Sequence, residues 1–291
     1  MDLTEQFRLA LKASRVDQGA RPGRLFHYTT AAGFEGIVSS ASIRATNFSF
    51  MNDPLELEYG RRLIHEHLTE RLATSTGGVA GALFRHCLEE LDRESGSEIY
   101  VSCFSSSEDD LSQWRAYGNT SARYALGFER RVIHAATLRP RSYSVRFSRV
   151  VYERGKQNEI LQKLLDGAET FVKRQSASES AVPTFGDILS LTLTRMLPTL
   201  KMPAFKPEAE WRIIIQMKPG DTSNLHFDTS RGIVRPFAVF PISEGQPLPL
   251  AQVIVLWPSR PEAAVKAARL VLLRAGIALN DVRYSEVPFA E

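Results

Sequence analysis

The stretch Arg24-Leu-Phe-His-Tyr-Thr-Thr30 decides how the fold begins. Its aromatic and β-branched residues predict a strand that ends at Thr29 or Thr30. Thr30 can then cap a helix, because the next eight residues place three apolar side chains at helical spacing, namely Phe34, Ile37 and Val38. The sequence therefore predicts a strand that leads directly into a capped helix.

Working outward from this unit, helices and strands follow in irregular order. Helical spacing predicts helices at about 55–72, 79–93, 111–117, 156–196 (as a pair) and 262–275. Alternating or apolar runs predict strands at about 42–50, 99–105, 123–128, 142–153, 206–216, 251–258 and 282–285. This order favours an α+β fold with mixed, mostly antiparallel sheets over a doubly wound sheet. No linker or repeat divides the sequence. We therefore expect a single domain over 1–291, with an N-terminal helix and helical inserts at about 55–93 and 156–196.

The composition excludes several classes of protein. Of the 291 residues, 43% are hydrophobic and 24% are charged, as in globular proteins, and the net charge of +3 gives no indication of a nucleic-acid partner. No apolar run approaches the roughly 20 residues that cross a bilayer, and the first residues predict a short amphipathic helix without the apolar core of a signal peptide. We therefore expect a cytoplasmic protein with no membrane contact. Cys87 and Cys103 lack partners at zinc-ligand spacing, so we expect buried thiols and no metal site.

His27 is the first candidate site residue. It lies near the end of the predicted strand, beside a helix start that favours an anion such as a pyrophosphate, and an imidazole there can donate to a ligand hydroxyl. A histidine after two apolar residues is also common as a structural hydrogen-bonding group. Tyr28 is equally open, because a lone aromatic residue in a strand usually packs in the core.

The second candidate is the acidic pair Glu208-x-Glu210. Strand alternation predicts that both carboxylates and Arg212 share one face, with Trp211 and Ile213 buried on the other. Two like charges on one face cost stability unless a cation offsets them, and such arrangements cluster at functional sites. In glycosyl transfer, one carboxylate can stabilise an oxocarbenium-like transition state while the other deprotonates an acceptor. The alternative is a surface ion pair of Glu208 and Arg212, with Glu210 solvated.

A third group follows the predicted strand at 99–105. Ser105 and the next two serines can donate to a phosphate or ribose, although a serine loop is often only a loop. Trp114 and Tyr117 are three residues apart on a short predicted helix and can form the wall of a pocket against a flat ring. Trp114 is more typical of a core residue, and Tyr117 stays open. The sequence contains no Ser-His-Asp arrangement, P-loop or GxGxxG motif.

Taken in order, the motifs resemble a large bacterial family known only as a domain of unknown function. The ordered set spans nearly the whole chain and consists of His27-Tyr-Thr-Thr, Asn52-Asp-Pro with Glu56, Cys103-Phe-Ser, Trp114-x-x-Tyr117, Gly127-Phe128, Glu208-x-Glu210-Trp-Arg212 and Ser285-x-Val-Pro. Each motif is loose by itself. The set as a whole is more specific than any of its parts.

The N-terminal part is also similar to the opening of ADP-ribosyltransferase folds, in which a strand with a histidine leads into Thr or Ser and a helix. This resemblance implies an ADP-ribosyltransferase-like core that uses NAD as substrate. It implies catalytic roles for Glu210 and Glu208, and it implies cofactor contacts from a further group of residues, namely His27, Tyr28, Thr29, Ser105, Tyr117 and Arg212. The middle motif of the transferases matches either Cys103-Phe-Ser105 or Tyr117.

These observations support two hypotheses about function. The first is an NAD-dependent ADP-ribosyltransferase or NAD glycohydrolase that transfers ADP-ribose to a macromolecule or to water, for which the resemblance implies a role in a toxin or in phage defence. The second is a non-catalytic nucleotide-binding sensor or interaction module. The enzyme hypothesis predicts that His27 and Glu210 line one cleft on neighbouring strands.

Overall fold

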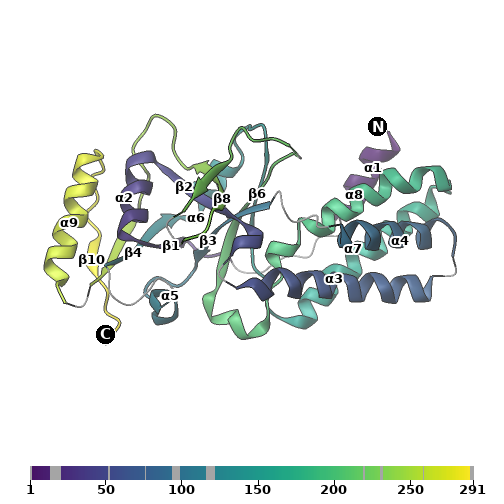
Figure 1. Cartoon of the computed structure of the whole chain (residues 1–291), viewed down its shortest axis with the longest axis horizontal. Helices are drawn as coiled ribbons and strands as arrows, with labels where there is room; N and C mark the ends of the chain where they lie inside the picture. The colour runs from purple at the N-terminus through teal and green to yellow at the C-terminus, as the bar shows by residue number, and fades with distance from the viewer. Residues whose placement is uncertain are drawn as a thin grey trace. The chain divides into compact units, whose positions relative to one another are not determined.

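The computed structural model describes residues 2–13, 21–51, 53–75, 77–93, 99–115, 122–218, 220–229, 232–257 and 259–288. It divides into two compact units (Figure 1). The helical unit comprises Met1–Gly19, Phe48–Ile99 and Val150–Phe205, and the sheet unit comprises Ala20–Asn47, Tyr100–Arg149 and Lys206–Glu291. None of the described helices combines the length and hydropathy that a membrane span requires.

The helical unit contains the two predicted helical inserts and the N-terminal helix. Its α-helices are α1 (Leu3–Ala13), α3 (Pro54–Thr74), α4 (Gly78–Asp92), α7 (Arg154–Arg174) and α8 (Val182–Thr194), with short 3-10 turns η1 (Phe48–Phe50), η2 (Glu179–Ala181) and η3 (Leu197–Thr199). Three aromatic rings join α1, α7 and α8, since Phe7 lies 5.1 Å from Phe171 and 4.7 Å from Phe185 between ring centroids. The amphipathic first helix is therefore anchored by its apolar face. Whether the whole chain folds as a single domain stays a prediction.

A buried glutamine links three segments of the helical unit. The Gln157 side chain on α7 accepts from the Tyr59 hydroxyl at 2.6 Å and donates to the carbonyl oxygens of Val151 at 2.7 Å and Lys201 at 2.8 Å. Its exposed fraction is 0%. Lys201 in turn pairs with the buried carboxylate of Glu56 at 3.5 Å. This polar network fixes α3, α7 and the segment after η3 to one another.

We expect Gln157→Leu to lower the free energy of unfolding by about 3 kcal/mol, because it removes three buried hydrogen bonds at once. Urea denaturation measures this change. Gln162→Leu, at an exposed position of the same helix, is the matched control and should change stability by less than about 0.5 kcal/mol. Equal losses in the two variants would contradict the structural role of the network.

The sheet unit is built on a mostly antiparallel open sheet. Its strands are β1 (Arg24–Thr30), β2 (Ser42–Asn47), β3 (Ile99–Ser105), β4 (Arg123–Glu129), β5 (Ser144–Arg149), β6 (Glu210–Gln216), β7 (His226–Asp228), β8 (Arg235–Pro241), β9 (Gln252–Leu256) and β10 (Val282–Tyr284). The order is β10-β9-β4-β1-β3-β2-β8-β7, and β6 pairs with both β3 and β5. β9 and β10 are parallel and are joined by helix α9 (Pro261–Arg274). The expected mixed α and β architecture with a mostly antiparallel sheet is confirmed.

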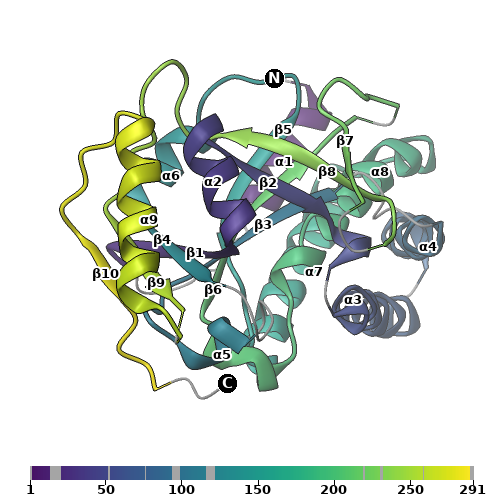
Figure 2. The ribbon, with the colours of Figure 1, turned by 60° about the vertical axis from the view of Figure 1, so that its left-hand side comes forward.

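Apolar side chains fill both faces of this sheet. The main core gathers residues of nearly every strand and the inner faces of α2 (Ala31–Ser40), α6 (Arg130–Thr137) and α9. On the other face lies a smaller second cluster, formed by Phe26, Tyr28, Trp114, Ala125, Ile254 and Leu256, with Trp114 supplied by the short helix α5 (Leu111–Arg115). Helices α2 and α9 lie side by side over the main core (Figure 2). Strands β1, β4 and β9 are therefore buried on both faces, which explains why each carries apolar residues at consecutive positions.

The start of α2 follows the predicted pattern. The Thr30 hydroxyl accepts a hydrogen bond from the Gly33 amide at 3.2 Å, so Thr30 is the N-cap. A side chain at position 33 would place its Cβ 2.0 Å from the Thr29 hydroxyl oxygen, which explains the glycine. Helix α6 and strands β7 and β8 were not predicted from the sequence, because α6 and β7 are short and β8 contains Pro236 next to its start.

Candidate functional site

The predicted site residues lie on three neighbouring parts of the sheet unit. His27, Tyr28 and Thr29 belong to β1, Ser105 ends β3, and Glu210 and Arg212 belong to β6. Thr29 is buried, with an exposed fraction of 7%. Tyr117 lies outside the described residues, as does Asn52 of the Asn-Asp-Pro motif.

Glu210 opens β6 and forms an ion pair with Arg212 of the same strand. Nη2 of Arg212 donates to Oε2 of Glu210 at 2.7 Å, and both side chains lie on one face because they are two residues apart. Glu210 is 7% exposed and Arg212 is fully buried. A buried charge is unfavourable unless it is paired, so the two side chains stay together. The ion pair therefore holds the Glu210 carboxylate in a fixed position. The prediction that Glu210 and Arg212 share a face is confirmed.

Glu208 does not belong to this strand, so the prediction of three charges on one strand face is wrong. Residues Pro203–Glu208 form the 3-10 turn η4, and β6 begins only at Glu210. Ala209 between the two acids has a left-handed backbone with φ of 47°. Alternation of side chains requires an extended backbone, which Pro207 in the turn and the left-handed Ala209 both interrupt.

Ser105 supports the turn that carries the two acids. Its hydroxyl donates to the carbonyl oxygen of Glu208 at 2.8 Å and accepts from the amide of Ser107 at 3.0 Å. The amide of Ser106 donates to the carbonyl oxygen of Ala209 at 3.1 Å. The end of β3 is therefore bonded directly to the residues that precede Glu210.

Tyr28 holds the loop that follows β3. Its hydroxyl donates to the carbonyl oxygen of Ser107 at 3.0 Å and accepts from the amide of Asp110 at 3.1 Å. Its ring packs edge-on against Trp114, with ring centroids 4.8 Å apart. Burial, followed by the nearby carboxylates, raises the pKa of the phenol above its ordinary value, so Tyr28 stays protonated and can keep donating.

His27 lies on the opposite face of β1 from Tyr28. Residues 26 and 28 contribute to the second cluster and Leu25 to the main core, so alternation turns His27 toward the main core. There its ring lies 5.5 Å from that of Phe104 between centroids. Nδ1 of His27 donates to the carbonyl oxygen of Cys103 at 2.8 Å and so ties β1 to β3.

The prediction that His27 and Glu210 line one cleft on neighbouring strands is wrong. Strand β3 lies between β1 and β6. Trp211 packs in the main core, so Glu210 points to the other face of the sheet, while His27 points toward the main core. Tyr28 belongs to the second cluster, and Ser105 follows Phe104 of the main core, so both lie on the same face of the sheet as Glu210. The candidate site is therefore the face that carries Tyr28, Ser105, Glu210 and Arg212.

We expect the protein to lose stability below about pH 6.5 because of His27. Burial lowers the pKa of His27 from 6.5, although the hydrogen bond to Cys103 opposes this. As the pH falls through 6.5, the unfolded chain binds a proton before the folded protein does, so stability drops by at most about 1.4 kcal/mol per pH unit until the folded pKa is reached. His27→Gln should flatten this part of a plot of melting temperature against pH. An unchanged profile in the variant would assign the acid sensitivity to other groups.

The role of the three acids after β3, Glu108, Asp109 and Asp110, was not predicted from the sequence. Asp109 accepts from Nε1 of Trp114 at 2.7 Å, from the Ser285 hydroxyl at 2.7 Å and from the Glu286 amide at 2.8 Å. Glu108 accepts from the Arg283 guanidinium and from Gln252, and these contacts lower its pKa. Asp110 caps α5 through the amide of Ser112 at 2.8 Å. A run of acids between a buried strand and a helix is the sequence signal for such a connecting loop.

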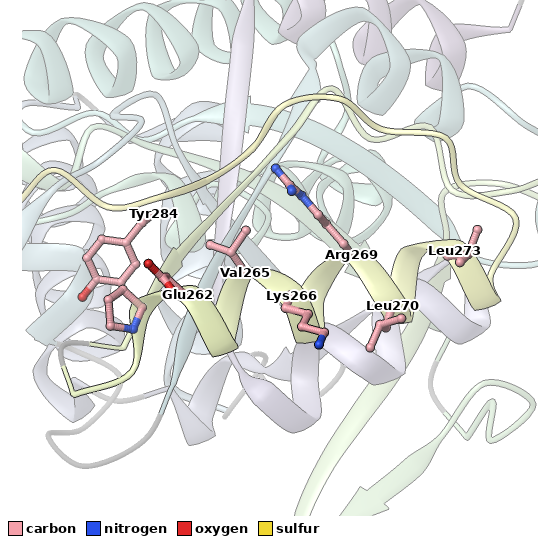
Figure 3. Close-up of a pocket in the computed structure, with 8 residues that line it drawn as sticks. Glu262, Val265, Lys266, Arg269, Leu270, Leu273 and Tyr284 are labelled. Carbon is pink, nitrogen blue, oxygen red and sulfur yellow. The ribbon is translucent and has the colours of Figure 1, made fainter.

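Two surface pockets of the sheet unit are lined by other residues. One of about 490 Å³ runs along α9, where Val265, Lys266 and Leu270 line it together with Tyr284 of β10 (Figure 3). The other, of about 580 Å³, lies at the ends of α2 and α9. Neither is lined by a predicted site residue that the structure describes. In the same described part of the chain, no three His, Cys, Asp or Glu side chains come together as a metal site.

Comparison with known proteins gives a family match for part of the chain. Residues 113–213 match the family described as "Protein of unknown function (DUF2971)". The matched span contains the acidic pair and Arg212, together with β4, β5 and the start of β6. No curated protein and no solved structure matches the chain. The match supports a relationship with an uncharacterised domain family and names no activity.

Proposed function

We propose that the sheet unit binds NAD on the face that carries Tyr28, Ser105 and Glu210, and that it cleaves the bond between nicotinamide and ribose. The observation that carries this proposal is the position of the Glu210 carboxylate, which Arg212 holds at the start of β6 at a distance of 2.7 Å. Glu210 keeps 7% of its surface exposed. The resemblance of the N-terminal part to the opening of ADP-ribosyltransferase folds supplies the choice of NAD. ADP-ribose then passes to a macromolecule or to water.

The chemistry of this cleavage requires a fixed negative charge. As the glycosidic bond breaks, the ribose becomes cation-like, so a carboxylate beside it stabilises the transition state more than the ground state. Arg212 keeps Glu210 in place, because a side chain bonded within its own strand has little freedom to move. An enzyme of this kind consumes cellular NAD, which accords with the toxin or phage-defence role that the resemblance implies.

In this proposal His27 is a positioning residue and not a contact of NAD. Its bond to the Cys103 carbonyl fixes the register of β1 against β3, two residues before Ser105. Ser105 in turn holds the turn before Glu210. The histidine thus acts on the site through the sheet.

A non-catalytic nucleotide sensor is the second candidate. It is favoured by the fact that Arg212 already neutralises Glu210 and that the hydroxyls of Tyr28 and Ser105 already have partners within the protein. Side chains whose hydrogen bonds and charges are already paired within the protein can keep these partners when a ligand binds. Such a module would hold a nucleotide without reacting with it.

One experiment separates the two candidates. The full chain is incubated with NAD alone and with cell lysate or nucleic acid as acceptor, while released nicotinamide and the calorimetric affinity for NAD are both measured. An enzyme releases nicotinamide above background in at least one condition, and a sensor binds a nucleotide without release. A chain that neither binds nor consumes NAD with any acceptor overturns the proposal that NAD is its ligand.

A further inference from the structure

Hydrogen bonds at both ends of the loop 105–110 connect the C-terminal segment 283–287 to the turn that carries Glu210. The path begins at Ser285, whose hydroxyl donates to Asp109 at 2.7 Å, and at the Glu286 amide, which donates to the other oxygen of the same carboxylate at 2.8 Å. The loop that contains Asp109 leads back to Ser105 and Ser106, which bond to the carbonyl oxygens of Glu208 and Ala209. The segment that follows β10 is thus linked, through the loop 105–110, to the acidic pair.

Asp109 is the central point of this path. Its carboxylate receives three donors from two parts of the chain: the C-terminal segment twice and the indole Nε1 of Trp114 once, at 2.7 Å. Trp114 packs on Tyr28, which bonds to the loop on both sides of Asp109 through Ser107 and Asp110. Hydrogen bonds to a charged acceptor are among the stronger ones in proteins, so this carboxylate fixes the loop firmly.

The turn at Ala209 needs such support. Its left-handed backbone, with φ of 47°, is unfavourable for a residue with a Cβ. The carbonyl oxygen of Ala209 accepts from both the amide of Ser106 at 3.1 Å and its hydroxyl at 3.3 Å, which holds the turn in this conformation. Because Glu210 follows Ala209 directly, the loop that holds Ala209 also determines the position of the Glu210 side chain.

We propose that Asp109 and Ser285 are positioning residues for Glu210, so that the C-terminal segment sets the geometry of the acidic pair. The inference rests on the proposed function, because it concerns how Glu210 is positioned in the proposed NAD site. Neither residue contacts the substrate. Each acts through the loop, Ser105 and the Ala209 turn, and a shift of about 1 Å at a catalytic group is enough to change a rate on the order of 100-fold.

The test uses the full chain with Asp109→Asn, Ser285→Ala and the double variant. An asparagine keeps the shape of the side chain but presents an amide to the Glu286 N–H, and alanine removes the serine hydroxyl. We expect each single change to lower kcat for nicotinamide release by about 10-fold to 100-fold with little change in KM, because the loss falls on the transition state. The double variant should be no worse than the poorer single one, because both act on one path.

A second variant separates positioning from stability. Ala209→Gly relieves the strained backbone, so the melting temperature should stay the same or rise, while the looser turn should lower kcat. Glu286→Gln changes an exposed side chain of the same segment and leaves the backbone amide intact, so it should retain full activity. If Asp109→Asn lowers the melting temperature and leaves kcat unchanged, the path is only structural and the inference fails.

Hydrogen exchange tests the inference even if NAD is not the substrate. In Ser285→Ala, the amides of residues 105–110 and 208–211 should exchange faster together, while those of β2 and β8 keep their protection. Joint loss of protection with no NAD turnover in the parent leaves the path standing and rejects the proposed function alone. Unchanged protection at 208–211 overturns the inference whatever the substrate is.

Discussion

Glu210→Gln should lower the rate of nicotinamide release from NAD by at least about 100-fold, a typical effect of losing one preorganised electrostatic contact. The neutral amide keeps the size of the side chain and can still accept from Arg212, but it no longer opposes the positive charge that develops on the ribose. Affinity for NAD should change little, because the interaction is made mainly in the transition state. Release of nicotinamide and calorimetric binding of NAD, measured on the same preparations, check both statements.

The contact with Arg212 requires a control for folding. Since Arg212 is fully buried and paired with Glu210, the variant also loses part of an ion pair, and its melting temperature must be measured alongside its activity. Glu244→Gln removes an exposed carboxylate of the same unit and should leave both properties unchanged. Full activity in a folded Glu210→Gln protein would show that this carboxylate takes no part in the cleavage of NAD and would contradict the role proposed for Glu210.

Trp211→Ala should destabilise the protein by about 3 to 5 kcal/mol, the usual cost of truncating a buried aromatic side chain. Trp211 is 7% exposed in the main core, and its ring lies 5.3 Å from that of Phe147 on the paired strand β5. β6 is paired on both edges, so the surrounding strands cannot easily close the space that the indole leaves. Chemical denaturation followed by circular dichroism measures the change.

An exposed aromatic residue of the same unit provides the comparison. Phe227 on β7 is 60% exposed, so Phe227→Ala should cost less than about 0.5 kcal/mol. A similar loss in the two variants would mean that Trp211 contributes through surface contacts rather than through the core.

Local patterns predicted the elements well where they were long or bounded by caps. Thr30 as the cap of α2, the helices of the helical unit and the buried side of β6 all followed from spacing and capping chemistry, which depend on residues a few positions apart. Glu208 failed because a period of two holds only while the backbone is extended, and Ala209 does not keep it extended. The residue types around Ala209 do not predict its left-handed backbone conformation.

The candidate site was harder to predict because adjacency in a motif is not adjacency in space. His27 and Tyr28 were grouped by their order in the sequence, whereas consecutive residues of a strand point to opposite faces. The contact of Asp109 with Ser285 joins residues that are 176 positions apart, so no local window contains it. Tertiary pairing of this kind appears only once the strands are assembled.

The interleaving of the two units along the chain has a consequence for folding. Strand β1 pairs with β4 through Phe26 and Gly127, and β2 pairs with β8 through Ile43 and Phe240, so the sheet needs partners from distant segments. Closing such loops costs entropy before the contacts form, which makes assembly of the sheet slow compared with that of local helices. During synthesis β2 must wait until β8 has emerged, so a site on this sheet is assembled only after the residues up to Pro241 have been made.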